Sequence, residues 1–210
     1  MRKFLAFFMA ILGILACACV FGTNMVLTPA DLGDQYPALP LNSAESGPQT
    51  RDQVINAACD PKKQAVEMDE THWVAEYVNE YDSPSGALSG SSGTTFLILS
   101  EADLFQTPDG AAEAVQDSIT DTLAGANTEC KGLSIGTVRS FDVPTIGDES
   151  WGSETGFTDT VGSRTFSGVA TIVISRKGQV LISESIARFG DTGAPDEAVR
   201  LTKLVVGRMN

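Results

Sequence analysis

The clearest pattern in the chain is a pair of apolar-rich runs at residues 167–187, separated by a short turn. The first run is apolar on both faces, and in the second Val180, Ile182 and Ile186 alternate with mostly polar residues. A period of two indicates β-strands. Gly178 has the conformational freedom that the second position of a tight hairpin turn needs. The pattern predicts the two longest strands of an antiparallel sheet, with the first in a central position.

Other periodic segments supply the remaining elements. Further strands are expected over residues 73–81, 94–99 and 137–143, with another short strand near Trp151. Helices are expected from Pro108 to Gly125 and from Pro195 to Arg208, because each begins with proline at its first position and carries an apolar stripe at helical spacing. We therefore expect an α+β fold, in which an antiparallel sheet of five or six strands has two long helices packed on one face.

The segment before the first strand is rich in turn-forming residues. Residues 28–33 predict one helical turn, with Thr28 as cap and Gly33 as stop, and residues 51–59 predict a short helix. The expected organisation is a targeting segment over residues 1–22, a linker with one helical turn over 23–50, and one extracytoplasmic domain over 51–210.

The N-terminus carries a targeting pattern. Arg2 and Lys3 precede an uninterrupted apolar run over residues 4–22. The run has three interpretations: a lipobox that leads to lipidation of Cys17 (or Cys19), an A-x-A-like site for ordinary signal peptidase at residues 16–18, or an uncleaved membrane span. We favour the lipoprotein, with the membrane as a partner through this anchor. All three interpretations place the domain outside the cytoplasm.

Cys59 and Cys130 are the two cysteines outside the targeting segment. Two lone cysteines in an exported chain are most simply a disulfide. The alternative is a pair of buried free thiols. No Cys-x-x-Cys spacing and no cluster of cysteine with histidine is present, so a metal site is not expected.

The charge balance excludes one class of partner. The chain has 14 basic and 27 acidic residues, a formal net charge of −13. A nucleic-acid binder needs a basic surface to displace counterions, so no nucleic-acid partner is expected.

Catalytic patterns are incomplete. Residues 132–136 match G-x-S-x-G, but a nucleophile elbow needs a following helix and a later histidine, and His72, the one histidine, precedes the serine. Asp148 and Glu149 are neighbours on a predicted strand and point to opposite faces. Three further acids are interpreted as residues at or near the start of a helix: Asp191, Asp196 and Glu197. The sequence predicts no catalytic residue, no metal and no cofactor, and therefore no enzyme.

The aromatic residues are the candidate for recognition. The set consists of Trp73, Tyr77, Tyr81 and Trp151. If three of them share an uncovered sheet face, they form a ligand platform. The alternative, which burial trends favour, is core packing beneath the helices.

Several short segments resemble a group of secreted bacterial lipoprotein domains. They are Leu27-Thr28 with Asp31-Leu32, Tyr81-Asp82-Ser83-Pro84, Thr107-Pro108-Asp109-Gly110-Ala111, Ile146-Gly147-Asp148-Glu149-Ser150 and the Ile-Ser-Arg-Lys-Gly-Gln-Val hairpin. Together they resemble the extracytoplasmic sensor domains of actinobacterial serine/threonine kinases and small lipoproteins of the PsbP/Mog1-like kind. The resemblance covers roughly residues 27–208, and it implies a fold more than a function, in a group whose members are mostly non-catalytic.

Three functions remain. The first is a non-catalytic, cell-surface domain that binds a small molecule or acts as a sensor, and it predicts a concave pocket with apolar walls and a few polar groups. The second is an envelope accessory protein that binds another protein, and it predicts an exposed apolar patch without a pocket. The third is an enzyme of unrecognised type, which needs converging titratable groups.

Overall fold

The computed structural model describes residues 22–36, 39–83, 92–126, 128–130, 133–161 and 164–209. The predictions for Cys17, Cys19 and the membrane anchor lie outside these residues. Within them, no helix has the length and apolar character that crossing a bilayer requires.

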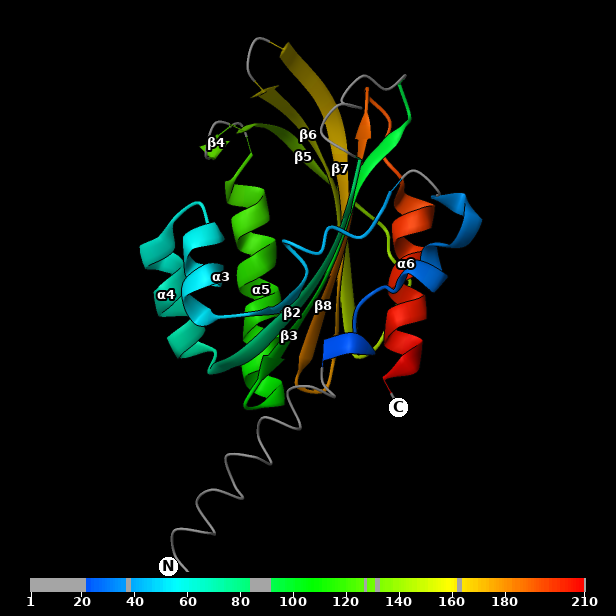
Figure 1. Ribbon diagram of the computed structural model, residues 1–210. Helices are drawn as coiled ribbons and strands as arrows, with labels where there is room; N and C mark the ends of the chain where they lie inside the picture. The colour runs from blue at the N-terminus through cyan, green and yellow to red at the C-terminus, as the bar shows by residue number, and fades with distance from the viewer. Residues whose placement is uncertain are drawn as a thin grey trace, which may run out of the picture.

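The described residues form one antiparallel sheet with helices on both sides (Figure 1). The strands are β1 (Gly47–Gln49), β2 (Trp73–Asp82), β3 (Thr95–Phe105), β4 (Glu129–Cys130), β5 (Leu133–Phe141), β6 (Glu149–Val161), β7 (Arg164–Lys177) and β8 (Val180–Phe189). Their order in the sheet is β1-β2-β3-β8-β7-β6-β5-β4. The helices are α2 (Pro29–Leu32), the 3₁₀ turn η1 (Gly33–Gln35), α3 (Arg51–Ala57), α4 (Pro61–Glu70), α5 (Pro108–Ala124) and α6 (Pro195–Arg208).

The predicted hairpin is the centre of the sheet. β7 and β8 pair from Gly168↔Phe189 to Lys177↔Val180, and they stand fourth and fifth from the β1 edge. Gly178 turns the chain with φ 61°, as the sequence predicts. The carboxylate of Asp148, in the turn just before β6, accepts a hydrogen bond from the Gly178 amide, 2.7 Å away, and supports the hairpin turn.

Two details of the predicted fold are wrong. The sheet has eight strands in the described residues rather than five or six, because β1 and β4 are only three and two residues long and give no periodic pattern. The two long helices lie on opposite faces rather than on one face (Figure 1). β8 requires cover on both sides, because Val180 and Ile182 are buried against the α6 side and Leu181 against the α5 side.

Residues 23–50, expected to be a linker, are partly built into the domain. Val26 and Leu27 are fully buried, and Leu32 and Leu39 join the same apolar cluster as α6. The predicted helical turn is present as α2, with Thr28 as N-cap and Gly33 as C-cap. The segment therefore closes the α6 face of the sheet and does not act as a free spacer.

Hydrogen bonds hold the first segment to the sheet. The carbonyl oxygen of Leu27 accepts from the Tyr81 hydroxyl (2.7 Å) and from the Asn79 amide (2.8 Å). The Leu27 amide donates to the Ser100 hydroxyl (2.8 Å), which donates to Glu184 (2.8 Å). Glu184 is 0 % exposed, and burial raises the pKa of its carboxyl well above the ordinary value.

The helix boundaries follow the predicted signals where those signals are strong. Thr107 caps α5 by accepting from the Gly110 amide, and Gly125 ends the helix as expected. Helix α3 confirms the short helix expected over residues 51–59, although it ends at Ala57. Helix α4 is a further element that was not predicted, because its sequence, PKKQAVEMDE, has almost no apolar stripe.

Gly110 allows the start of α5 to approach the turn before β2. A Cβ atom at this position would lie 2.2 Å from the carbonyl oxygen of Thr71. Backbone atoms cannot yield as a side chain does, so only glycine fits without a shift of the helix.

Gly110→Ala should therefore lower the free energy of unfolding by about 1–3 kcal/mol, the usual cost of overpacking. Gly207→Ala is the matched control, since a Cβ there meets nothing within 4 Å, and a helical alanine gains up to about 1 kcal/mol over glycine. Urea unfolding of both variants measures the difference. Equal effects of the two substitutions would contradict the close approach.

Candidate ligand-binding cleft

A cleft lies between helices α4 and α5 and the face of the sheet that they cover. Its larger part, which we call the apolar chamber, has a volume of about 790 Å³. The sheet supplies an apolar floor, made of Leu133, Ile135, Phe157, Ala170 and Ile172. The volume and the apolar floor are those of a small-molecule site.

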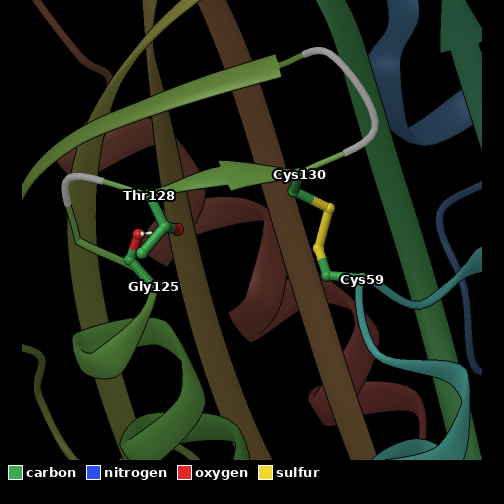
Figure 2. Close-up of a disulfide and its surroundings, with 4 residues drawn as sticks. All are labelled: Cys59, Gly125, Thr128 and Cys130. Carbon is green, nitrogen blue, oxygen red and sulfur yellow. Dashed lines mark hydrogen bonds between the residues drawn. A yellow bond between two sulfur atoms is a disulfide. The ribbon is translucent and has the colours of Figure 1, made fainter.

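The disulfide forms the rim of this chamber. Cys59 and Cys130 are joined, as their isolation in the sequence predicts, with Cα atoms 5.4 Å apart. The bond ties the connection between α3 and α4 to the short strand β4 (Figure 2). The Thr128 hydroxyl donates to the carbonyl of Gly125 (2.5 Å), which fixes β4 to the end of α5. The rim is therefore covalently closed.

The smaller part of the cleft, which we call the acidic chamber, has a volume of about 380 Å³. Three carboxylates from β2 and β3 project into it: Glu76, Glu101 and Asp103. Glu76 and Asp103 are direct cross-strand partners, and Glu101 lies two residues from Asp103 on the same face. The two chambers adjoin, since five residues line both: Gln64, Glu67, Asp121, Thr122 and Ile172.

Burial raises the pKa of all three carboxyls, and repulsion from neighbouring carboxylates adds to the rise at Glu76 and Glu101. Burial is the larger cause for each, and the neighbouring charges of Asp103 and Glu101 add to it at Glu76. The pKa is raised to about 9 for Glu76, about 7 for Glu101 and about 6 for Asp103. A hydrogen bond from Trp73 Nε1, 2.9 Å from Asp103 Oδ1, opposes the rise at Asp103.

Cationic partners are nearly missing from the cleft. Among the described residues that line the two chambers, Lys63 is the only lysine, arginine or histidine. Its ammonium group is already paired with Glu67 (3.1 Å) and with Asp121. The acidic chamber therefore carries excess negative charge once its carboxyls ionise.

The predicted aromatic set is divided between the two faces of the sheet. Tyr77 and Tyr81 pack in the cluster under α6, whereas Trp73 and Trp151 pack with α5. An irregularity in the β2 ladder between Trp73 and Ala75 breaks the alternation that the sequence suggested. The four residues therefore do not share a face, although Trp73 does line the acidic chamber.

The other candidate residues lie in a strand, in a turn or in ion pairs, and they do not come together in a site. Ser134 lies within β5, where it pairs with Thr158, and not at a strand-to-helix elbow. His72 is exposed in the turn before β2. Asp148 and Glu149 both pair with Arg176, at 3.1 and 2.5 Å.

The three acids near the start of α6 do not meet in a site. Asp191 is exposed in the loop after β8, and its carboxylate accepts a hydrogen bond from the neighbouring Thr192 hydroxyl. Asp196 and Glu197 lie in the first turn of the helix, as expected. Glu197 also accepts a hydrogen bond from the Tyr36 hydroxyl, 2.9 Å away.

The acidic chamber has no counterpart among the features that the sequence predicts. The alternation over residues 73–81 places Glu76 on one face with Val74 and Val78, and that face gives no sign of a carboxylate cluster. The predicted strand over 94–99 stopped before Glu101 and Asp103, which continue its alternation to Phe105. Within the described part of the chain, no group of three or more histidine, cysteine or acidic side chains has the arrangement needed to hold a metal ion.

No protein-family model matches the chain, and no curated protein sequence matches it. Among solved structures, the fold is similar to the extracellular domain of PknH from Mycobacterium tuberculosis, with a TM-score of 0.53. The similarity covers 88 % of this chain and 92 % of that one at 12 % identity. It supports the kinase-sensor part of the resemblance at the level of the fold, and not the PsbP/Mog1-like part.

The raised pKa values predict that stability falls as the pH rises. Unfolded carboxyls lose their protons near pH 4, whereas Asp103, Glu101 and Glu76 lose theirs from about 6 to about 9. Between these limits the folded chain binds more protons than the unfolded chain, so the free energy of unfolding decreases as the pH rises. The melting temperature should decrease from about pH 5 to about pH 9, measured by circular dichroism.

The double variant Glu101→Gln/Asp103→Asn should flatten this dependence and raise the melting temperature at pH 8. The melting temperature should rise by about 2–4 °C for each kcal/mol by which removing these buried charges raises the free energy of unfolding. Glu45→Gln/Asp142→Asn removes the same kinds of charge from exposed positions and is the control. If the control flattens the profile equally, general charge repulsion and not the acidic chamber causes it.

Proposed function

We propose that the domain is an extracytoplasmic, sensor-like domain that binds a small molecule in the cleft and has no catalytic activity of its own. The observation that carries the proposal is the apolar chamber of about 790 Å³ with a few polar groups at its end. A pocket with apolar walls and a few polar groups is what the sequence analysis expects of a ligand-binding domain.

The fold and the disulfide support the proposal. The similar solved structure is described as an extracellular domain of PknH, which agrees with a location outside the cytoplasm. A disulfide that closes the rim of the cleft persists in an oxidising compartment. We further propose that the chain is a lipoprotein held to the membrane through Cys17 or Cys19.

The accessory-protein hypothesis has less support. The large apolar side chains that are exposed in the described residues are Leu41, Val66, Val74, Leu123 and Leu204. They belong to the segment before β1 and to α4, β2, α5 and α6, one to each. Single apolar residues distributed in this way are ordinary on a soluble surface.

Filling the apolar chamber tests the function. Phenylbutanol, an uncharged apolar alcohol, should bind the full chain in phospholipid nanodiscs with saturable heat, measured by titration calorimetry against empty nanodiscs. Ala170 lies on the chamber floor, so Ala170→Trp should weaken binding by at least about tenfold, equivalent to about 1.4 kcal/mol.

Thr165→Trp is the matched control for this experiment, because it adds the same side chain to an exposed position of the same strand. The control should bind as the unaltered chain does. If phenylbutanol fails to bind the unaltered chain, or binds both variants equally, the cleft is not a ligand site.

Intact mass spectrometry tests the anchor. The chain extracted from the membranes of the cells that express it should have a mass that fits a start at Cys17 or Cys19 plus acyl groups. Replacing both cysteines with serine should abolish the acyl mass. A full-length, unmodified mass from the unaltered chain would instead leave a transmembrane anchor.

A further inference from the structure

The two chambers of the cleft differ in chemistry and adjoin each other. The floor of one is apolar, and the other carries Glu76, Glu101 and Asp103. Ile172 and Gln64 line both chambers. An occupant that reaches from one chamber to the other therefore meets an apolar wall at one end and carboxylates at the other.

The arrangement of the three carboxylates destabilises the folded sheet. Directly opposed like charges on neighbouring strands destabilise a sheet, and Glu76 lies opposite Asp103. Along β3, Glu101 and Asp103 are two residues apart, a separation of about 7 Å. The elements that cover the chamber add Glu67, Asp117 and Asp121. The one cation beside them that lines the cleft in the described residues, Lys63, is already paired with Glu67 and Asp121.

Trp73 adds a second feature that favours a cation. Its indole lines the acidic chamber and donates to Asp103 Oδ1 at 2.9 Å. An aromatic ring next to carboxylates is the environment in which proteins hold organic ammonium groups.

A buried hydroxyl in the wall of the apolar chamber is unsatisfied. Thr155 is 9 % exposed and lines the chamber from β6, where it lies between Val138 and Ala170. Its Oγ1 atom has no hydrogen-bond partner among the described residues. Buried hydroxyls are normally hydrogen-bonded, so the wall of the apolar chamber holds one unmet polar group.

We infer that the ligand of the proposed cleft is an organic cation with an apolar body, which lies in the apolar chamber and places its ammonium group among Glu76, Glu101 and Asp103. The inference rests on the proposed function and adds the charge of the ligand to it. An inorganic cation is a poorer match, because no described cluster has the arrangement of a metal site. An anionic ligand would face the repulsion of all three carboxylates.

A series of probes with one apolar body and different charges tests the inference. Phenylbutylammonium, phenylbutanol and phenylbutyrate are titrated into the full chain in phosphatidylcholine nanodiscs at pH 8, with empty nanodiscs as blanks. Phenylbutylammonium should bind at least about tenfold more tightly than phenylbutanol, and phenylbutyrate more weakly than both.

The charge preference should depend on the acidic chamber alone. Glu101→Gln/Asp103→Asn should remove the preference for phenylbutylammonium, measured as the ratio of its affinity to that of phenylbutanol on the same variant. Glu45→Gln/Asp142→Asn, with both changes at exposed positions, should keep the preference. The preference should also shrink at pH 5, where Glu76, Glu101 and Asp103 hold protons in the folded chain.

Three results would overturn the inference: equal affinity for all three probes, a preference for phenylbutyrate, or displacement of phenylbutylammonium by calcium chloride at matched ionic strength. In each of these, binding of phenylbutanol that Ala170→Trp abolishes would keep the proposed function. If none of the probes binds, the proposed function fails together with the inference.

Discussion

The structure depends on the antiparallel pairing of β3, β8 and β7. These strands are the middle of the sheet, and their side chains alternate between two covered faces. Each face needs its own cover of helix and chain, since apolar residues point both ways. The N-terminal segment and α6 cover one face, and α4 and α5 cover the other. The cleft lies where this second cover leaves the sheet incompletely filled.

The sequence was informative where local chemistry decides the structure. The central hairpin, the caps of α5 at Thr107 and Gly125, and the turn at residues 28–33 depend on neighbouring residues and were predicted correctly. The side of the sheet on which a helix packs depends on distant segments, so the opposite placement of α5 and α6 was not predicted. Periodicity also cannot distinguish a solvated face from one under helices, which hid Glu76. The apolar run that predicts β3 ends at Leu99, before Glu101 and Asp103. The kinase-sensor resemblance is supported at the level of the fold.

The acidic chamber shows a conflict between stability and binding. Three close carboxyls under the helices keep protons to a higher pH than solvated carboxyls do, and this lowers the stability of the fold as the pH rises. Apolar residues would fit the same strands at lower cost. The conflict is the main reason to regard this end of the cleft as functional, because polar groups that weaken a fold are most often found at sites of binding.

A single layer of strands separates the cleft from the N-terminal segment, and successive residues of each strand face opposite sides. On β3, Ser100 faces the first segment and bonds the Leu27 amide, whereas the next residue, Glu101, faces the cleft. On β8, Glu184 and Ser183 are divided in the same way, since they pair with Ser100 and Glu101. A peptide unit is planar and stiff, so any displacement of β3 in the cleft moves Ser100 together with Glu101. A movement of β3 caused in the cleft is thus transmitted to the segment that leads to the N-terminus, although the two lie on opposite sides of the sheet.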